Sequence, residues 1–341
     1  MTPRQLICFF ITILIAASTA SAQVLQRYEF ESQHMGTTFQ IILYAENNSL
    51  AEAASDNAFK TVEELNSILS DYLPSSELSQ LSQTAGSGNA VKVSPPLFDL
   101  LMQSKRISEE TNGWFDITIG PYTHIWRGLN RMSEPELPSD KELSEAASHV
   151  GYKKIVLDEA RRTAELKTKG MRLDPGGIGK GFASDRALKT LQESGITQAL
   201  INAGGDISAG DPPPGKEGWS IAVPVRFDED SVRYEELIIS NRAVNTSGSL
   251  YQSVEIDGKS YSHIINPKTG LGHTHQVQVT TISLDGAAAD AFATALSVMP
   301  SADAQELVES KADIEAVIFW LNDDGTIVRW ISSGYDDFLK Q

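Results

Sequence analysis

A glycine-rich segment constrains the fold of this chain most strongly. Four of the eight residues from Asp174 to Gly181 are glycine, and a helix is expected from Phe182 to Ser194. Glycine lets a backbone take positive φ and come close to a ligand or another backbone, and amides at a helix start favour an anion. The spacing fits neither a dinucleotide fingerprint nor a Walker loop, because no Ser or Thr follows Lys180. The segment therefore predicts an anion-binding loop or, alternatively, a tight turn with close helix packing.

A second segment of small residues, from Ala287 to Met299, predicts a helix that carries two oxygen donors. Asp290 and Thr294 are four residues apart, which places both side chains on one helix face. Carboxylate and hydroxyl oxygens are hard ligands that suit Mg²⁺ or Ca²⁺ rather than zinc. The surrounding alanines would let another backbone approach and donate a carbonyl. The alternative is a surface carboxylate and a hydroxyl at the edge of the core.

Three further segments could line a site. A strand predicted from Ser260 to Ile265 carries His263 next to a Pro/Gly turn, where it could accept a proton from a hydroxyl nucleophile or be merely structural. Trp114 and Phe115 stand beside Asp116 and could flank a flat ring or pack in the core. The residues 245–249 resemble a polar binding turn.

Hydrophobic spacing predicts a mixed α/β unit with several insertions, without a fixed-period repeat or a low-complexity linker. The expected helices are Ala51–Leu69, Leu97–Thr111, Lys141–His149, Phe182–Ser194 and Ala287–Met299. The expected strands include Phe39–Tyr44, Gln198–Asn202, Trp219–Val225, Leu237–Ser240, Val277–Leu284 and Ile314–Trp320.

The start of the chain has the pattern of an export signal. Arg4 precedes the apolar stretch from Leu6 to Ala17, and a small-x-small cleavage site ends at Ala22. We therefore expect a signal peptide over 1–22 and one exported, periplasmic domain over 23–341. The only cysteine, Cys8, lies inside this apolar stretch and would leave with it, so the mature chain would have no thiol. Cys8 also lies too early to be a lipoprotein cysteine. The formal net charge of −17 disfavours nucleic acid as a partner.

Taken together, these segments resemble the FAD:protein FMN transferases, the ApbE family. The resemblance covers nearly the whole mature chain. Its marks are Met35-Gly36-Thr37, the Tyr72 region, Phe115 to Pro121, Asp174 to Gly181, Ala203-Gly204-Gly205-Asp206, Thr246-Ser247-Gly248, His263 to Gly270 and Ala289 to Ala295.

The resemblance implies an ApbE-like α+β fold, related to the T-fold, with a mixed sheet core, antiparallel strands and flanking helices. It also implies transfer of FMN from FAD, with Mg²⁺, to a threonine of an acceptor protein through a phosphoester bond, with release of AMP. The usual acceptor is a subunit of a membrane redox complex. By the same resemblance Gly177, Asp290 and Thr294 would hold the metal, and His263 would be the general base. The FAD site would be lined by Met35, Tyr72, Trp114, Phe115, Asp116, Asp174, Lys180 and Ile265.

Two residues depart from the family pattern. Asn266 stands where many members have Asp, and its side-chain oxygen could still keep the turn. Gly179 stands where alanine is frequent, which would loosen the loop. Two other functions stay open at this stage: an FAD pyrophosphatase that yields FMN and AMP, and a periplasmic flavin-binding protein without turnover.

Overall fold

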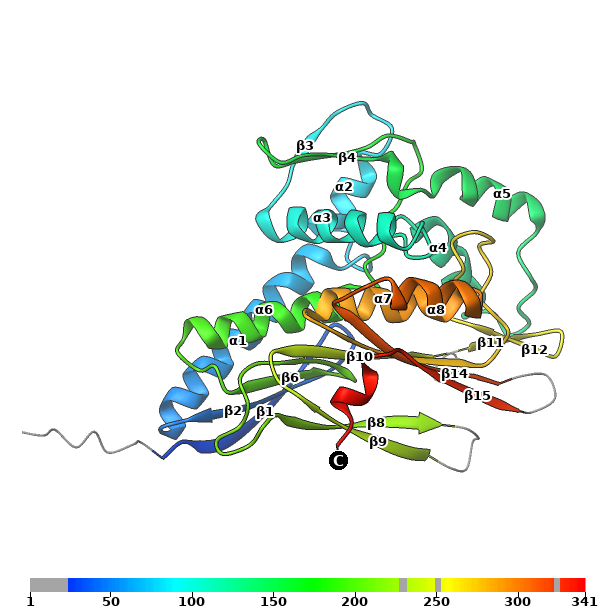
Figure 1. Ribbon diagram of the computed structural model, residues 1–341. Coiled ribbons are helices and arrows are strands. Elements are labelled where there is room, and N and C mark those ends of the chain that lie inside the picture. The colour runs from blue at the N-terminus through cyan, green and yellow to red at the C-terminus, as the bar shows by residue number, and fades with distance from the viewer. Residues whose placement is uncertain (1–23, 227–231, 249–252, 322–325, 341) are drawn as a thin grey trace, which may run out of the picture.

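An eight-stranded antiparallel sheet forms the centre of the molecule (Figure 1). The computed structural model describes residues 24–226, 232–248, 253–321 and 326–340. In spatial order the strands are β1 (Gln26–His34), β2 (Thr37–Ala45), β6 (Ala199–Ala203), β7 (Asp206–Ala209), β10 (Arg242–Gly248), β13 (Val277–Ser283), β14 (Ile314–Leu321) and β15 (Ile327–Ile331). Every residue of β13 is buried, as expected for a central strand covered on both faces.

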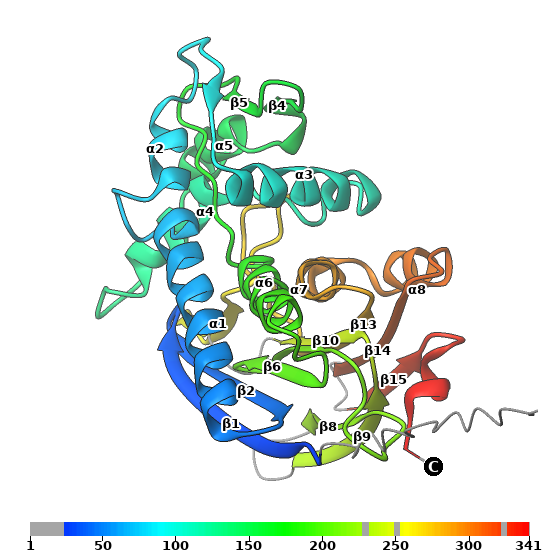
Figure 2. The ribbon, with the colours of Figure 1, turned by 90° about the vertical axis from the view of Figure 1, so that its left-hand side faces the viewer.

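Four helices cover one face of this sheet (Figure 2). They are α1 (Asn48–Leu69), α6 (Gly179–Glu193), α7 (Gly286–Val298) and α8 (Ser301–Glu309). Helix α1 is amphipathic and buries one stripe of residues at helical spacing. Helix α7 is buried along its whole length except at Thr294. Because α7 is enclosed, its polar side chains must find partners inside the protein.

The opposite face of the sheet packs on a separate apolar cluster. It is covered by the hairpin of β8 (Trp219–Arg226) and β9 (Val232–Ile239) and by the turn η2 (Tyr335–Phe338) (Figure 2). The two faces therefore have their own cores, and the site described below lies on the helical side.

A second layer, here called the cap layer, lies beyond the helices (Figure 1). It contains α2 (Glu77–Gln83), α3 (Pro95–Glu110), α4 (Gly120–Leu129), α5 (Asp140–His149), η1 (Tyr152–Lys154) and the small sheet of β3 (Val91–Lys92), β5 (Thr163–Leu166) and β4 (Ile155–Asp158). The hairpin of β11 (Ser253–Ile256) and β12 (Lys259–Ser262) packs against α4 and α5. The glycine-rich segment leads from the cap layer into α6.

The α+β fold with flanking helices and antiparallel strands is confirmed, and the expected helices are present. Two local predictions were wrong, and one helix was missed. Residues 245–248 continue strand β10 rather than forming a turn, because they pair with β13 on one side. The strand predicted to reach Ile265 ends at Ser262, where the chain bends. Helix α4 was not predicted, since Gly120-Pro121 has the composition of a turn although proline is well tolerated in a first helical turn.

The predicted signal peptide falls outside the described residues. None of the helices within the described part of the chain has the length and apolarity that a membrane crossing needs.

Candidate functional site

Helices α6 and α7 pack unusually closely at their N-terminal ends. A methyl group on Gly181 would clash with the carbonyl oxygen of Gly286, so glycine is required there for packing. The carboxylate of Asp185 on α6 accepts hydrogen bonds from the N–H groups of Gly286 (2.8 Å) and Ala287 (3.0 Å). Burial raises the pKa of Asp185 to about 6, although the hydrogen bonds from these two N–H groups lower it. The first turn of α7 is thereby fixed on α6.

This packing brings the predicted metal-binding residues together. The N–H of Gly181 donates to Asp290 Oδ2 at 3.2 Å. A methyl group built on Gly177 would lie 2.9 Å from Thr294 Oγ1, so the loop backbone passes directly over that side chain. Asp290 and Thr294 therefore share the face of α7 that meets the glycine-rich segment, as their spacing predicts. Close helix packing, one of the two alternatives predicted for this segment, is confirmed at Gly181, whereas anion binding by the loop stays a prediction.

The donor set of this cluster fits a hard divalent cation. Asp290 is 3% exposed, and burial together with the charge of Asp206 raises its pKa to about 7. Carboxylate, hydroxyl and carbonyl oxygens are the ligands that Mg²⁺ takes. Across the described stretches no group of three or more His, Cys, Asp or Glu side chains could hold a metal ion. A cation at this place would therefore rely on Thr294 and the loop backbone besides one carboxylate.

Lys180 places a positive charge beside the same carboxylate. Its Nζ contacts Asp206 Oδ2, and Asn245 Nδ2 donates to the other oxygen of Asp206. Burial alone would lower the pKa of Lys180, but the charges of Asp206 and Asp290 outweigh it and raise that pKa. The ion pair of Lys180 is therefore with the carboxylate of Asp206.

The β1–β2 turn borders this region. Gly204, in the turn between β6 and β7, has φ +65°, and a methyl group there would clash with the hydroxyl of Thr37. Met35 precedes this contact with φ +49° and is half-buried against the main core. The Met-Gly-Thr segment and the glycine turn before Asp206 are thus neighbours in space.

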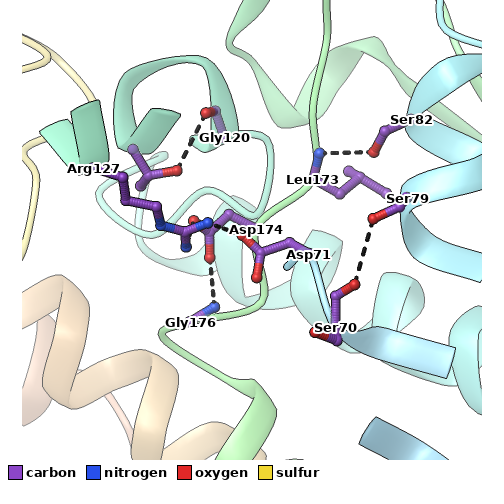
Figure 3. Close-up of polar contacts among 10 residues, drawn as sticks. Ser70, Asp71, Ser79, Ser82, Gly120, Arg127, Leu173, Asp174 and Gly176 are labelled. Atoms are coloured by element: carbon purple, nitrogen blue, oxygen red, sulfur yellow. Dashed lines mark hydrogen bonds and ion pairs between the residues drawn. The ribbon is translucent and has the colours of Figure 1, made fainter. Parts of the chain in front are cut away.

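An arginine joins the end of α1 to the start of the glycine-rich segment (Figure 3). Arg127 Nη2 donates to Asp174 Oδ2 at 2.8 Å, and its Nη1 donates to Asp71. The guanidinium lies 4.1 Å from the centre of the Tyr72 ring, which is 70% exposed. Burial and the neighbouring Asp174 raise the pKa of Asp71 to about 6, against the effect of Arg127. Asp174 and Tyr72 are therefore linked through one cation.

The aromatic segment has a partly structural role. Phe115 belongs to the main core. The carboxylate of Asp116 accepts the N–H groups of Thr118 and Tyr152, each at 2.8 Å, and thereby shapes the turn before α4. Burial raises the pKa of Asp116, against the effect of these donors. Trp114 is half-buried, with Lys268 Nζ 5.6 Å from its ring. Of the three residues, Trp114 has the freedom to contact a ligand.

His263 is exposed and follows directly after β12. Ile265 is buried in the cluster formed with α4. The side-chain oxygen of Asn266 accepts the N–H of Lys268 at 2.8 Å, so asparagine keeps the turn as expected. Trp126 Nε1 donates to the carbonyl of Gly270 at 2.8 Å and fixes the far end of the loop.

Sequence reasoning missed two charged residues of this region, Asp185 and Arg127, and quoted Asp206 only as part of a motif, without a site role. Asp206 stands at the end of a glycine turn, which is a usable signal. Asp185 and Arg127 follow no local pattern, because each acts on segments far away in the chain.

Comparison with known proteins agrees with this arrangement. The family model described as the ApbE family matches residues 35–318. FAD:protein FMN transferases from Klebsiella pneumoniae and Haemophilus influenzae are 26% and 27% identical, covering 97% and 96% of this chain and 95% and 96% of those proteins. The solved flavin transferase ApbE from Vibrio cholerae superposes with a TM-score of 0.82 at 25% identity, covering 93% of this chain and 100% of that one. The apbe protein of Thermotoga maritima gives 0.79 at 27% identity, with the same coverage.

Proposed function

We propose that this chain, which belongs to the ApbE family, is a Mg²⁺-dependent FAD:protein FMN transferase. The observation that carries the proposal is the contact between the glycine-rich segment and α7, where Gly177 lies against Thr294 and the N–H of Gly181 donates to Asp290. When bound there, the cation would neutralise the pyrophosphate of FAD as its bridging oxygen leaves. A metal also explains how a chain with a net charge of −17 can hold an anionic substrate.

In the proposed reaction a threonine hydroxyl of the acceptor protein attacks the phosphorus on the FMN side of the pyrophosphate. The new oxygen–phosphorus bond forms as the bond to the AMP oxygen breaks, so FMN stays on the acceptor and AMP leaves. His263 takes the threonine proton, a role that suits an exposed imidazole. The chain's other groups orient the reactants and contribute positive charge.

FAD would lie between the cap layer and the helices on the sheet. Residues that resemble the family's flavin-binding positions come from both sides: Tyr72, Trp114 and Asp174 from the cap layer and its connection, and Lys180 from α6. Ile265, Phe115 and Asp116 would support the site from beneath, because all three are buried. Met35 would contribute from the β1–β2 turn.

We further propose that the acceptor is a subunit of a membrane redox complex and that the enzyme acts after export, in the periplasm. The apolar leader that ends in a small-x-small site supports the second point.

The test is an incubation of the chain from Gln23 with FAD and Mg²⁺, with and without an acceptor domain carrying a flavinylation threonine. Mass spectrometry follows the acceptor and the small molecules. We expect an FMN-mass adduct on the acceptor, an equal amount of AMP, and the loss of both with Asp290→Ala.

Free FMN and AMP with an unmodified acceptor would instead indicate a pyrophosphatase. Intact FAD in every sample would contradict both enzymatic functions and favour a flavin-binding protein.

A further inference from the structure

Within the described residues, only one ion pair joins α4 to the glycine-rich segment, the pair of Arg127 with Asp174. The guanidinium of Arg127 is 30% exposed, and the Asp174 side chain that it pairs with is 4% exposed. Burying a carboxylate is costly unless it is paired with a cation and hydrogen-bonded. Arg127 supplies the charge, and the fork of its N–H groups reaches Asp71 as well (Figure 3).

Asp174 in turn holds the backbone of the loop that follows it. Its Oδ1 accepts the N–H of Gly176 at 2.8 Å, while Oδ2 is held by Arg127. Its own N–H donates to the carbonyl of Ile117 at 2.8 Å. The next residue after Gly176 is Gly177, whose backbone passes over Thr294. A continuous series of contacts thus runs from Arg127 to the proposed metal-binding carbonyl.

The same helix holds the loop that begins at His263. Trp126, next to Arg127 in the chain, donates from Nε1 to the carbonyl of Gly270 at 2.8 Å. Its ring also lies 5.6 Å from that of Tyr261, two residues before His263. Helix α4 therefore contacts both the segment that carries Gly177 and the segment that carries His263.

We propose that Arg127 is a positioning residue that sets the Gly177 backbone for cation binding, and that α4 fixes the spacing between this backbone and the His263 loop. The inference rests on the proposed function. Without the guanidinium, Asp71 and Asp174 would face each other as like charges, and Asp174 would lose the partner that holds it toward Gly176. A lysine would restore the charge but not the planar fork that reaches two carboxylates.

The experiment measures metal binding separately from turnover. Mn²⁺ alone is titrated by electron paramagnetic resonance into wild type, Arg127→Met and Arg127→Lys, without FAD. We expect the Met variant to bind Mn²⁺ about tenfold more weakly or worse, as for the loss of a residue that orients metal ligands, and the Lys variant to lie between. In turnover, the Mg²⁺ concentration for half-maximal transfer should rise in parallel, and by a larger factor than the KM for FAD at saturating Mg²⁺.

Arg186→Met is the matched control. Arg186 has the same 30% side-chain exposure, pairs with Asp99 at 2.7 Å and lies 4.8 Å from the ring of Phe182. It lies on α6 but takes no part in the contacts leading to Gly177. We expect its Mn²⁺ binding to equal that of wild type even if its melting temperature falls.

Unchanged Mn²⁺ binding in Arg127→Met would overturn the proposal. A large rise in the KM for FAD with unchanged Mn²⁺ binding would also overturn it, because Arg127 would then act on the FAD site and not on the metal site. If Arg127→Met fails to fold, the double variant Asp71→Asn/Arg127→Met removes the like-charge pair and repeats the titration. If wild type binds Mn²⁺ but neither transfers nor cleaves FAD, the proposed function fails while the positioning role is still measured.

Discussion

Replacing Asp290 by asparagine should stabilise the metal-free protein while it removes activity. Asp290 is fully enclosed in α7, and its pKa is raised from the ordinary 3.8 to about 7, first by burial and then by the charge of Asp206. At about 1.4 kcal/mol per pH unit, this difference corresponds to roughly 4 kcal/mol of free energy of unfolding. Asparagine has the shape of the protonated acid and can still accept the N–H of Gly181. We expect Asp290→Asn to gain up to about 4 kcal/mol above pH 7.

The sign follows from proton linkage. Between pH 3.8 and about 7 the folded chain binds a proton at Asp290 that the unfolded chain releases, so this group lowers stability as pH rises through that window. Below pH 4 both states are protonated, and the advantage of asparagine should vanish. Urea denaturation in EDTA at pH 4, 6 and 8 measures the difference directly.

Added Mg²⁺ provides the control. A cation that binds only the folded state stabilises it in proportion to the logarithm of its concentration. Wild type should therefore be stabilised by Mg²⁺ at pH 8, whereas Asp290→Asn should not. If the variant is less stable than wild type in EDTA at pH 8, the carboxylate is not penalised by burial and the reasoning is refuted.

Three further outcomes follow from the same contacts. Gly181→Ala forces a methyl group onto the carbonyl of Gly286, and urea denaturation should show a loss of about 1–3 kcal/mol together with weaker Mg²⁺ binding. Lys180→Met leaves Asp206 charged and buried without its partner, which should lower the free energy of unfolding by about 3–5 kcal/mol. The double variant Lys180→Met/Asp206→Asn should recover part of this stability, and no recovery would contradict the pairing. His263→Ala should keep FAD and metal affinity in calorimetry while transfer falls about 10²- to 10⁴-fold; a loss of FAD binding instead would assign His263 to the substrate site.

The sequence predicts those parts of the site that depend on local spacing. Asp290 and Thr294 are one helical turn apart, and any helix of that composition puts them on one face. The glycines around the start of α6 likewise predict a close approach of two backbone segments. The structure shows such an approach at Gly177, in the loop, and at Gly181, in the helix. Local rules suffice wherever the partner lies within the same element or next to it.

The missed features depend on chain segments that are distant in sequence. Arg127 pairs with Asp71 and Asp174, which lie 56 and 47 residues away. Asn245 was assigned to a turn, yet its side chain reaches Asp206, 39 residues away, because β10 lies beside β7 in the sheet. No periodicity encodes such pairs, since strand order and layer packing decide them.

The burial that destabilises Asp290 is also what suits it to hold a cation. A carboxylate in a water-poor environment attracts a divalent ion far more strongly than an exposed one does. The free energy lost on folding without metal would thus be recovered on binding of the proposed ion. Lys180 moderates this balance, because its ammonium charge lies near Asp290 but pairs directly with Asp206. Were Lys180 paired with Asp290 instead, it would compete with the ion, so we infer that the Asp206–Asn245 pair keeps the carboxylate of Asp290 available for metal.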